Sequence, residues 1–177
     1  METLRKPFLL LLVFVAGIAN AQQQDTEFTK GWLLNLKLTN GAVTNFSSTA
    51  PDAYTGGLSL NPQVTVVPGL LRLGANLGAA YAHKKMSGLL GPMVALKLTE
   101  FGTKNFGTLA NMHLIAEANW GTNRQQMIGG GLGFEILSLA HIGITAQRDY
   151  KLNNWWLQSF IAIRLNKQKQ DTDKYAR

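Results

Sequence analysis

In the segment Leu71-Arg-Leu-Gly-Ala-Asn-Leu-Gly-Ala-Ala-Tyr81, residues of two kinds alternate along the whole length. One set of positions is apolar, from Leu71 to Tyr81, and the set between them is polar or small, including Arg72 and Asn76. Successive side chains of a β-strand point to opposite faces. The stretch therefore predicts a strand with one apolar and one polar face.

The same alternation recurs along the rest of the chain, and short connectors such as Val67-Pro68-Gly69 separate the alternating stretches. Neighbouring strands with such connectors pair antiparallel. An even number of strands can close into a barrel that has no open edge. The sequence therefore predicts an all-β fold, an eight-stranded antiparallel up-and-down barrel. The predicted strands are Gly31–Thr39, Tyr54–Val67, Leu71–Tyr81, Leu89–Thr99, Leu109–Trp120, Gln126–Leu137, Leu139–Tyr150 and Trp155–Asn166.

Composition excludes several classes of protein. The chain has 177 residues, of which 46% are hydrophobic and 15% charged, with no Cys and a net charge of +7. It is too apolar to be a disordered chain, and it has no disulfide framework, thiolate metal site or cysteine nucleophile. The basic balance fits nucleic acid or an anionic membrane surface.

The first segment, Met1–Ala21, reads as a cleaved secretory signal peptide: two cations precede a compact apolar run, which ends at Ala19-Asn20-Ala21. Export would separate the chain from cytoplasmic nucleic acid, so no nucleic-acid partner is expected. No later stretch is long and apolar enough for a transmembrane helix. The expected organisation is a signal peptide (1–21), a periplasmic lead (22–27), a barrel (28–166) and a charged periplasmic tail (167–177).

The polar faces of the predicted strands indicate which side of the barrel is enclosed. They combine many glycines with isolated charges, whereas a solvated surface would carry denser charge. We therefore expect these faces to line a narrow lumen, filled by side chains and non-conducting, in which the charges are paired. Each strand is also long enough to cross a bilayer, which takes about 9–11 residues. The predicted lumen charges are Lys37, Arg72, Lys97, Glu117, Glu135 and Arg164.

Aromatic residues gather at one end of the predicted barrel. If the chain starts on the periplasmic side, this end is extracellular, and Trp and Tyr belong at the interface between membrane and water. The expected interface aromatics are Tyr54, Tyr81, Trp120, Tyr150, Trp155 and Trp156. A thinner set, Phe28, Trp32, Phe101 and Phe106, falls at the other end.

Over Phe28–Asn166, this pattern of strands, turns and aromatics resembles the small eight-stranded outer-membrane barrels, such as the OmpX family and the transmembrane domain of OmpA. The resemblance implies an integral protein in the outer membrane of a Gram-negative bacterium. Two features depart from these barrels. The last strand is followed by a charged tail rather than ending on an aromatic residue, and only Asn40–Ala53 is long among the outer connections.

Some outer-membrane barrels modify lipid A or phospholipid, and lipid A deacylases carry a His-x-Ser arrangement. None of His83, His113 and His141 is followed by Ser two residues later. His113 and Glu117 would lie roughly 13 Å apart along a strand, too far to share a metal ion. The glycines of 129–133 lack the residues of a phosphate loop and are interpreted as lumen and curvature residues. We expect no enzyme, cofactor or metal; a lipid-modifying barrel enzyme and a soluble lipocalin-like secreted binder are the alternatives.

Cations in the outer connections predict contacts to the phosphates of lipopolysaccharide, with ordinary loop charge as the alternative. These cations are Lys84, Lys85, Arg124 and Lys151. On the periplasmic side, a long connection at Glu100–Gly107 and the tail Lys167–Arg177 point to contacts with other outer-membrane or periplasmic proteins. The expected role is a structural protein, either a solitary barrel or an accessory or scaffold subunit of a larger complex.

Overall fold

The computed structural model describes residues 28, 31–46, 52–103, 107–137 and 139–166. The expected signal peptide, the periplasmic lead and the charged tail lie outside the described residues. Within these residues, no helix is long and apolar enough to cross a membrane.

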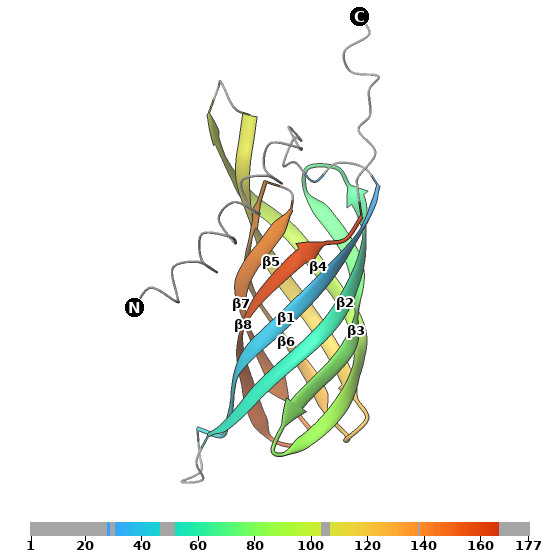
Figure 1. Ribbon diagram of the computed structural model, residues 1–177, viewed down its shortest axis with the longest axis vertical. Helices are drawn as coiled ribbons and strands as arrows, with labels where there is room; N and C mark the ends of the chain where they lie inside the picture. Colours follow the sequence, from blue (N-terminus) through green and yellow to red (C-terminus); the bar gives the residue numbers. More distant parts are fainter. Residues whose placement is uncertain (1–27, 29–30, 47–51, 104–106, 138, 167–177) are drawn as a thin grey trace, which may run out of the picture.

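Eight strands form one closed barrel in which each strand pairs antiparallel with the next along the chain, and β1 pairs antiparallel with β8 (Figure 1). The all-β, eight-stranded antiparallel barrel predicted from the alternation is therefore confirmed. The strands are β1 (Trp32–Thr44), β2 (Ala53–Val67), β3 (Leu71–Ala82), β4 (Lys85–Thr103), β5 (Gly107–Gly121), β6 (Gln126–Ile136), β7 (Ala140–Asp149) and β8 (Asn154–Arg164).

The predicted strand bounds need correction in β1 and β4. The first strand continues five residues beyond the predicted end, to Thr44, so the long outer connection is shorter than the sequence indicates. The expected long connection Glu100–Gly107 is largely strand, because β4 continues to Thr103 and β5 starts at Gly107. These two strands form a hairpin that extends past the other connections at the end of the barrel where the chain enters β1 and leaves β8 (Figure 1).

A β-bulge in β4 reverses the faces of the hairpin. Lys97 lies opposite His113, but Thr99 lies opposite Met112, so one extra residue is inserted between them. Strict alternation would put Thr99 on the lumen face with Lys97, and the bulge places it with the outward-facing Met112 instead. Glu100 then returns to the inner side opposite Asn111, where its carboxylate forms an ion pair with Lys97.

Two glycines of β6 allow a close approach to β7. A Cβ built on Gly131 would lie 1.8 Å from the Ile144 carbonyl oxygen, and one on Gly129 would lie 2.0 Å from the Ala146 carbonyl oxygen. A side chain at either position would therefore force the backbones apart.

The barrel closes along the pairing of β1 with β8. Beyond the ladder, the Leu34 amide donates to Asn166 Oδ1 at 2.6 Å, and Asn166 Nδ2 donates to the Trp32 carbonyl oxygen at 3.0 Å. The Leu165 amide adds a bond to the Leu34 carbonyl oxygen at 2.8 Å. These contacts fix the start of β1 against the end of β8.

Candidate functional sites in the lumen and at the rim

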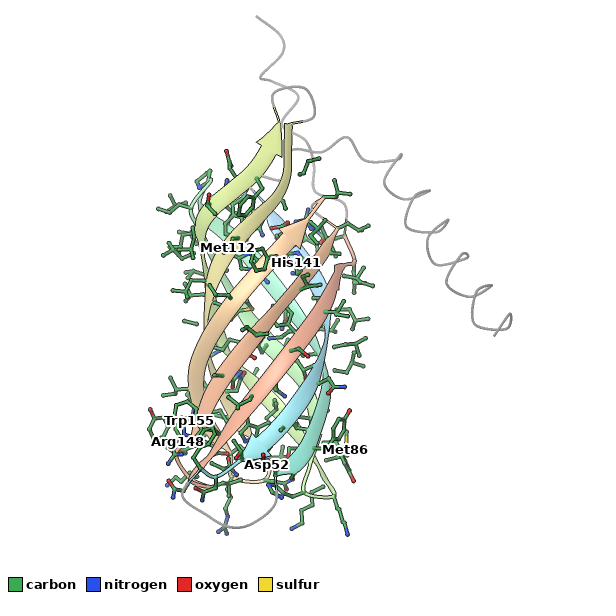
Figure 2. The ribbon with its side chains drawn as sticks, turned by 90° about the vertical axis from the view of Figure 1, so that its left-hand side faces the viewer. Asp52, Met86, Met112, His141, Arg148 and Trp155 are labelled. Carbon is green, nitrogen blue, oxygen red and sulfur yellow. The ribbon has the colours of Figure 1, made fainter. Side chains whose placement is uncertain are left out.

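The wall of the barrel is apolar outside and polar inside. Leu77 is 46% exposed on the outer surface, whereas its neighbour Asn76 is 5% exposed and faces the lumen. Apolar side chains project outward around the barrel in Figure 2. A water-soluble barrel has the opposite arrangement, since its apolar face fills the interior. The inside and outside predicted from the alternation therefore agree with the structure in every strand, apart from the reversal after the bulge in β4.

Glu135 joins the first of two polar clusters in the lumen. This fully buried carboxylate accepts hydrogen bonds from Arg72 Nη1 at 2.8 Å and from Arg164 Nη2 at 2.5 Å. It also accepts one from Asn111 Nδ2 at 3.3 Å, and His141 Nε2 lies 3.8 Å from its Oε1 atom. One carboxylate thus connects five strands, and its two guanidinium partners leave this cluster with a surplus of positive charge.

Phe28 closes this end of the lumen. Its side chain is 0% exposed, and its ring centroid lies 3.7 Å from Arg72 Cζ and 5.9 Å from the His113 ring centroid. The Gly69 amide donates to the Phe28 carbonyl oxygen at 2.9 Å, which fixes the residue against the turn between β2 and β3. Phe28 therefore covers the charged cluster and does not lie on the outer wall, where its place in the thinner aromatic set had predicted it. Phe106 lies outside the described residues.

Glu117 joins the second polar cluster. Its Oε1 atom accepts a hydrogen bond from Lys37 Nζ at 2.6 Å, and its Oε2 atom accepts one from Gln147 Nε2 at 2.9 Å and one from Asn76 Nδ2 at 3.1 Å. Asn119 Nδ2 donates to Gln147 Oε1 at 3.1 Å. Here one cation and several amides share one carboxylate, so the charges of the ion pair balance.

Two apolar clusters separate and close these polar layers, which is clearest along the inner face of β8. We call the end of the barrel that carries the β1–β2, β3–β4, β5–β6 and β7–β8 connections the turn end. Starting from the turn end, the inner face of β8 presents, in order, Trp156, Gln158, Phe160, Ala162 and Arg164. Trp156 belongs to one apolar cluster, Phe160 and Ala162 to the other, and Arg164 to the Glu135 cluster. The clusters consist of Val43, Ala80, Ala82, Met127 and Trp156, and of Met93, Ile115, Phe160 and Ala162.

Little open space remains between the layers. A cavity of about 40 Å³ lies beside Lys37 and Glu117 and is lined by residues of the second polar cluster. Because one water needs roughly 10–15 Å³ of such volume, the cavity has room for only a few waters. All six predicted lumen charges lie on the inner side of the wall, and each is in an ion pair: Lys37 with Glu117, Arg72 and Arg164 with Glu135, and Lys97 with Glu100.

Five of the six predicted interface aromatics lie on the outer wall at the turn end. Tyr54, Tyr81, Trp120 and Tyr150 are exposed, and Trp155 is half-buried. The expectation for Trp156 is wrong: it is 1% exposed and faces the lumen, where its Nε1 atom donates to Asn154 Oδ1 at 3.1 Å. Adjacent tryptophans on one strand point to opposite sides of the wall, so only Trp155 can reach an interface.

The predicted basic contacts surround the same end and are exposed. Lys84 occupies the turn between β3 and β4, Lys85 begins β4, Arg124 occupies the turn between β5 and β6, and Lys151 the turn between β7 and β8. Sequence interpretation missed Arg148, which faces outward from β7 beside this rim, with its Cζ atom 5.5 Å from the Trp155 ring centroid. Its signal was the alternation itself, because it follows Ile142, Ile144 and Ala146 on the outer face.

The three histidines lie at two separate places in the fold. His113 and His141 face the lumen with ring centroids 5.9 Å apart at a near-perpendicular angle. His83 occupies the turn between β3 and β4 with a positive φ of 48°. Among the residues that the structure describes, no group of three or more His, Cys, Asp or Glu could hold a metal ion.

Comparison with known proteins gives a likeness in structure and none in sequence. Neither a protein-family profile nor a curated protein matches the chain. Among solved structures, a de novo designed transmembrane β-barrel is similar at 13% identity and a TM-score of 0.49, over 79% of this chain and 100% of the design. The solution NMR structure of the de novo designed protein TMB2.3 is similar at 16% identity and a TM-score of 0.43, over 81% of this chain and 99% of that protein. The inside and the outside of this barrel are therefore identified from its own residues.

Proposed function

We propose that this protein is an integral β-barrel of a Gram-negative outer membrane, with a filled lumen and a structural or accessory role. The observation that carries the proposal is the polarity of the wall. Large apolar side chains such as Leu77, Leu114 and Ile144 cover the outer surface, while the buried charges lie inside. An apolar outer band on a closed barrel is favourable in hydrocarbon and costly in water.

The proposed orientation places the turn end outside the cell. The entry into β1, the exit from β8 and the β4–β5 hairpin lie together at the opposite end (Figure 1), which is then periplasmic. Both the expected signal peptide at 1–21 and the rim aromatics support this orientation, because an exported chain inserts from the periplasm. The basic rim would then meet the phosphate-rich outer leaflet.

The filled lumen supports a role without conduction. Two apolar clusters and two paired polar clusters occupy the interior, so ions have no continuous wet path. Planar-bilayer recording of the purified protein should show no stable open conductance. Reproducible large channels would refute the filled-lumen role while leaving the membrane location standing.

The membrane location is tested directly by flotation. Mature protein that has been refolded with phospholipid vesicles should float with them and should stay in the pellet after alkaline washing. A chain that folds in buffer without detergent or lipid, and that remains soluble, would refute the proposal and favour a secreted binder.

The accessory role rests on the hairpin and on the tail. Leu98 and Phe101 are exposed on the outer side of the hairpin, beyond the last residue that β4 pairs with β3. Partners that co-purify in mild detergent should be released when Glu100–Gly107 is replaced by a tight turn and Lys167–Arg177 is deleted, while the barrel still folds. A lone monomer from the native membrane would leave the solitary structural barrel as the function.

A further inference from the structure

The outer surface at the turn end of β5–β8 carries cations that have no carboxylate partner. Among the described residues, none of Arg124, Arg148 and Lys151 is in an ion pair, whereas every cation facing the lumen is. Arg148 is the unusual one, because it projects from the strand itself between Ile128 on β6 and Trp155 on β8. Asn153 Oδ1 accepts a hydrogen bond from one nitrogen of this guanidinium, and its other N–H donors can bind an anion.

The guanidinium of Arg148 is held in place. It donates from Nη2 to Asn153 Oδ1, and its Cζ atom lies 5.5 Å from the Trp155 ring centroid. Asn153 takes a positive φ of 54° in the turn between β7 and β8, and so brings its side chain back toward β7. Figure 2 shows Arg148 and Trp155 together at this rim. A cation that is fixed before binding loses less side-chain entropy when a ligand arrives.

Asp149 fixes the turn that carries Lys151. Its buried carboxylate accepts amide hydrogen bonds from Lys151 at 3.0 Å, from Leu152 at 3.1 Å and from Gln126 at 3.2 Å. The Tyr150 amide donates to the Gln126 carbonyl oxygen at 2.9 Å. The two turns that carry Arg124 and Lys151 are therefore hydrogen-bonded to each other through the start of β6.

An open pocket of about 320 Å³ lies on the same part of the wall, and none of the three cations is in its lining. It lies over β5, β6 and the end of β7, and Ile128 in its lining pairs directly with Arg148. Two aromatic rings, Trp120 and Tyr150, form part of its lining. Aromatic rings and cations on one part of a rim suit a ligand with an anionic head and an apolar or sugar body.

We propose that this surface, Arg124, Arg148 and Lys151 with the Trp120–Tyr150 pocket, binds the phosphorylated disaccharide headgroup of lipopolysaccharide in the outer leaflet. Arg148 and Lys151 contact a phosphate, and the pocket receives the sugar and the first part of an acyl chain. This inference rests on the proposed outer-membrane location and orientation. The proposal is a single lipid-binding site on the rim that prefers one lipid. The alternative is a uniformly basic rim, which would attract any anionic lipid equally.

The test compares two double variants of the full mature chain in zwitterionic detergent micelles. Arg148→Gln with Lys151→Gln removes two cations of the proposed site. Lys84→Gln with Lys85→Gln removes two cations of the same rim that lie at the β3–β4 connection, outside the β5–β8 surface. The probes are bisphosphorylated lipid A, dephosphorylated lipid A and phosphatidylglycerol, and binding is measured by native mass spectrometry and titration calorimetry.

We expect the Arg148/Lys151 double variant to bind bisphosphorylated lipid A at least about tenfold more weakly than wild type, because it has lost two charged donors to the phosphate. The Lys84/Lys85 variant should stay within about twofold of wild type, because long-range attraction is screened by salt. Dephosphorylated lipid A should bind wild type as weakly as bisphosphorylated lipid A binds the Arg148/Lys151 variant. A third variant, Tyr150→Ala, should weaken all lipid A binding while leaving the phosphate preference.

Three results would overturn the site. Equal losses in the two double variants would mean diffuse attraction by the whole rim. Equal binding of phosphatidylglycerol and bisphosphorylated lipid A would mean a general anionic-lipid surface, and no binding by a wild-type chain that floats with vesicles would mean no lipid site. Failure of wild type to float refutes the membrane location itself, so the two proposals fail by different measurements.

Discussion

The inner and outer surfaces of the barrel wall differ in whether their charged side chains are paired. Inside, Glu135 and Glu117 each meet cations within hydrogen-bond distance, and every described lysine, arginine and glutamate that faces the lumen is paired. Outside, the rim cations form no ion pair among the described residues. An enclosed charge needs a partner from the same chain, whereas a charge at a rim remains available to another molecule.

The largest expected effect comes from removing the carboxylate that two arginines share. Glu135→Ala leaves Arg72 and Arg164 buried together without an anion, and such a loss costs about 3–5 kcal/mol. Urea unfolding of the vesicle-inserted barrel measures it. Glu100→Ala is the matched control, because that carboxylate is half-exposed and should lose at most about 1 kcal/mol. Equal losses would mean that the lumen is wetter than its packing indicates.

A charge placed on the outer wall should have the next largest effect. Leu77→Lys and Leu114→Lys put an ammonium into the apolar band and should each lower the free energy of unfolding by about 2–4 kcal/mol near the bilayer midplane. Leu152→Lys, in the turn between β7 and β8, should change it by no more than about 0.5 kcal/mol. If Leu77→Lys unfolds like the parent barrel in lipid, the outer wall does not face hydrocarbon.

Substitution in the Lys37–Glu117 pair should lower the free energy of unfolding less than substitution of Glu135. After Lys37→Met, the carboxylate of Glu117 keeps its amide donors from Asn76 and Gln147. A double-mutant cycle of Lys37→Met with Glu117→Gln should give a coupling energy of about 0.5–3 kcal/mol. The loss for Lys37→Met alone should be smaller than for Glu135→Ala, and a reversed order would contradict the assigned roles of the two clusters.

The smallest effect belongs to the outer cations. Lys84→Gln with Lys85→Gln breaks no ion pair among the described residues and should change the free energy of unfolding by no more than about 0.5 kcal/mol. The measurement is the same urea titration in low and high salt. A loss above that range would show that the rim cations stabilise the fold, and the contrast with the lumen would disappear.

The alternation of side chains was sufficient to predict the barrel because it indicates, for each residue of a strand, which side of the wall its side chain faces. Each apolar position in Leu71–Tyr81 faces outward and each polar or small one faces inward, and the lumen charges Arg72 and Glu135 follow the same rule. The same rule also places Trp156 inside, one residue after the outward Trp155. The sequence interpretation grouped both by their position at a strand end and so misplaced one of them.

Features that depend on contacts between distant residues were not predictable in this way. The bulge after Lys97 is defined only by the register of β4 against β5. The local sequence pattern therefore does not predict that Thr99 faces outward. Phe28 precedes the first strand and acquires its role from Arg72, which lies on β3. The rim site likewise needs β6, β7 and β8 side by side before Arg148 and its neighbours become one surface.

The closure of β1 on β8 has a consequence for how the chain reaches this structure. Seven of the eight strand pairings are hairpins between neighbours, but the bond from the Leu34 amide to Asn166 joins residues 132 positions apart. Local hairpins close short loops at small entropic cost, whereas this contact must wait for nearly the whole barrel. We therefore expect a sheet with two open edges to accumulate first and the β1–β8 junction to set the rate of folding. Until that step, the edges of β1 and β8 are the places where an assembling barrel is open to pairing with another chain.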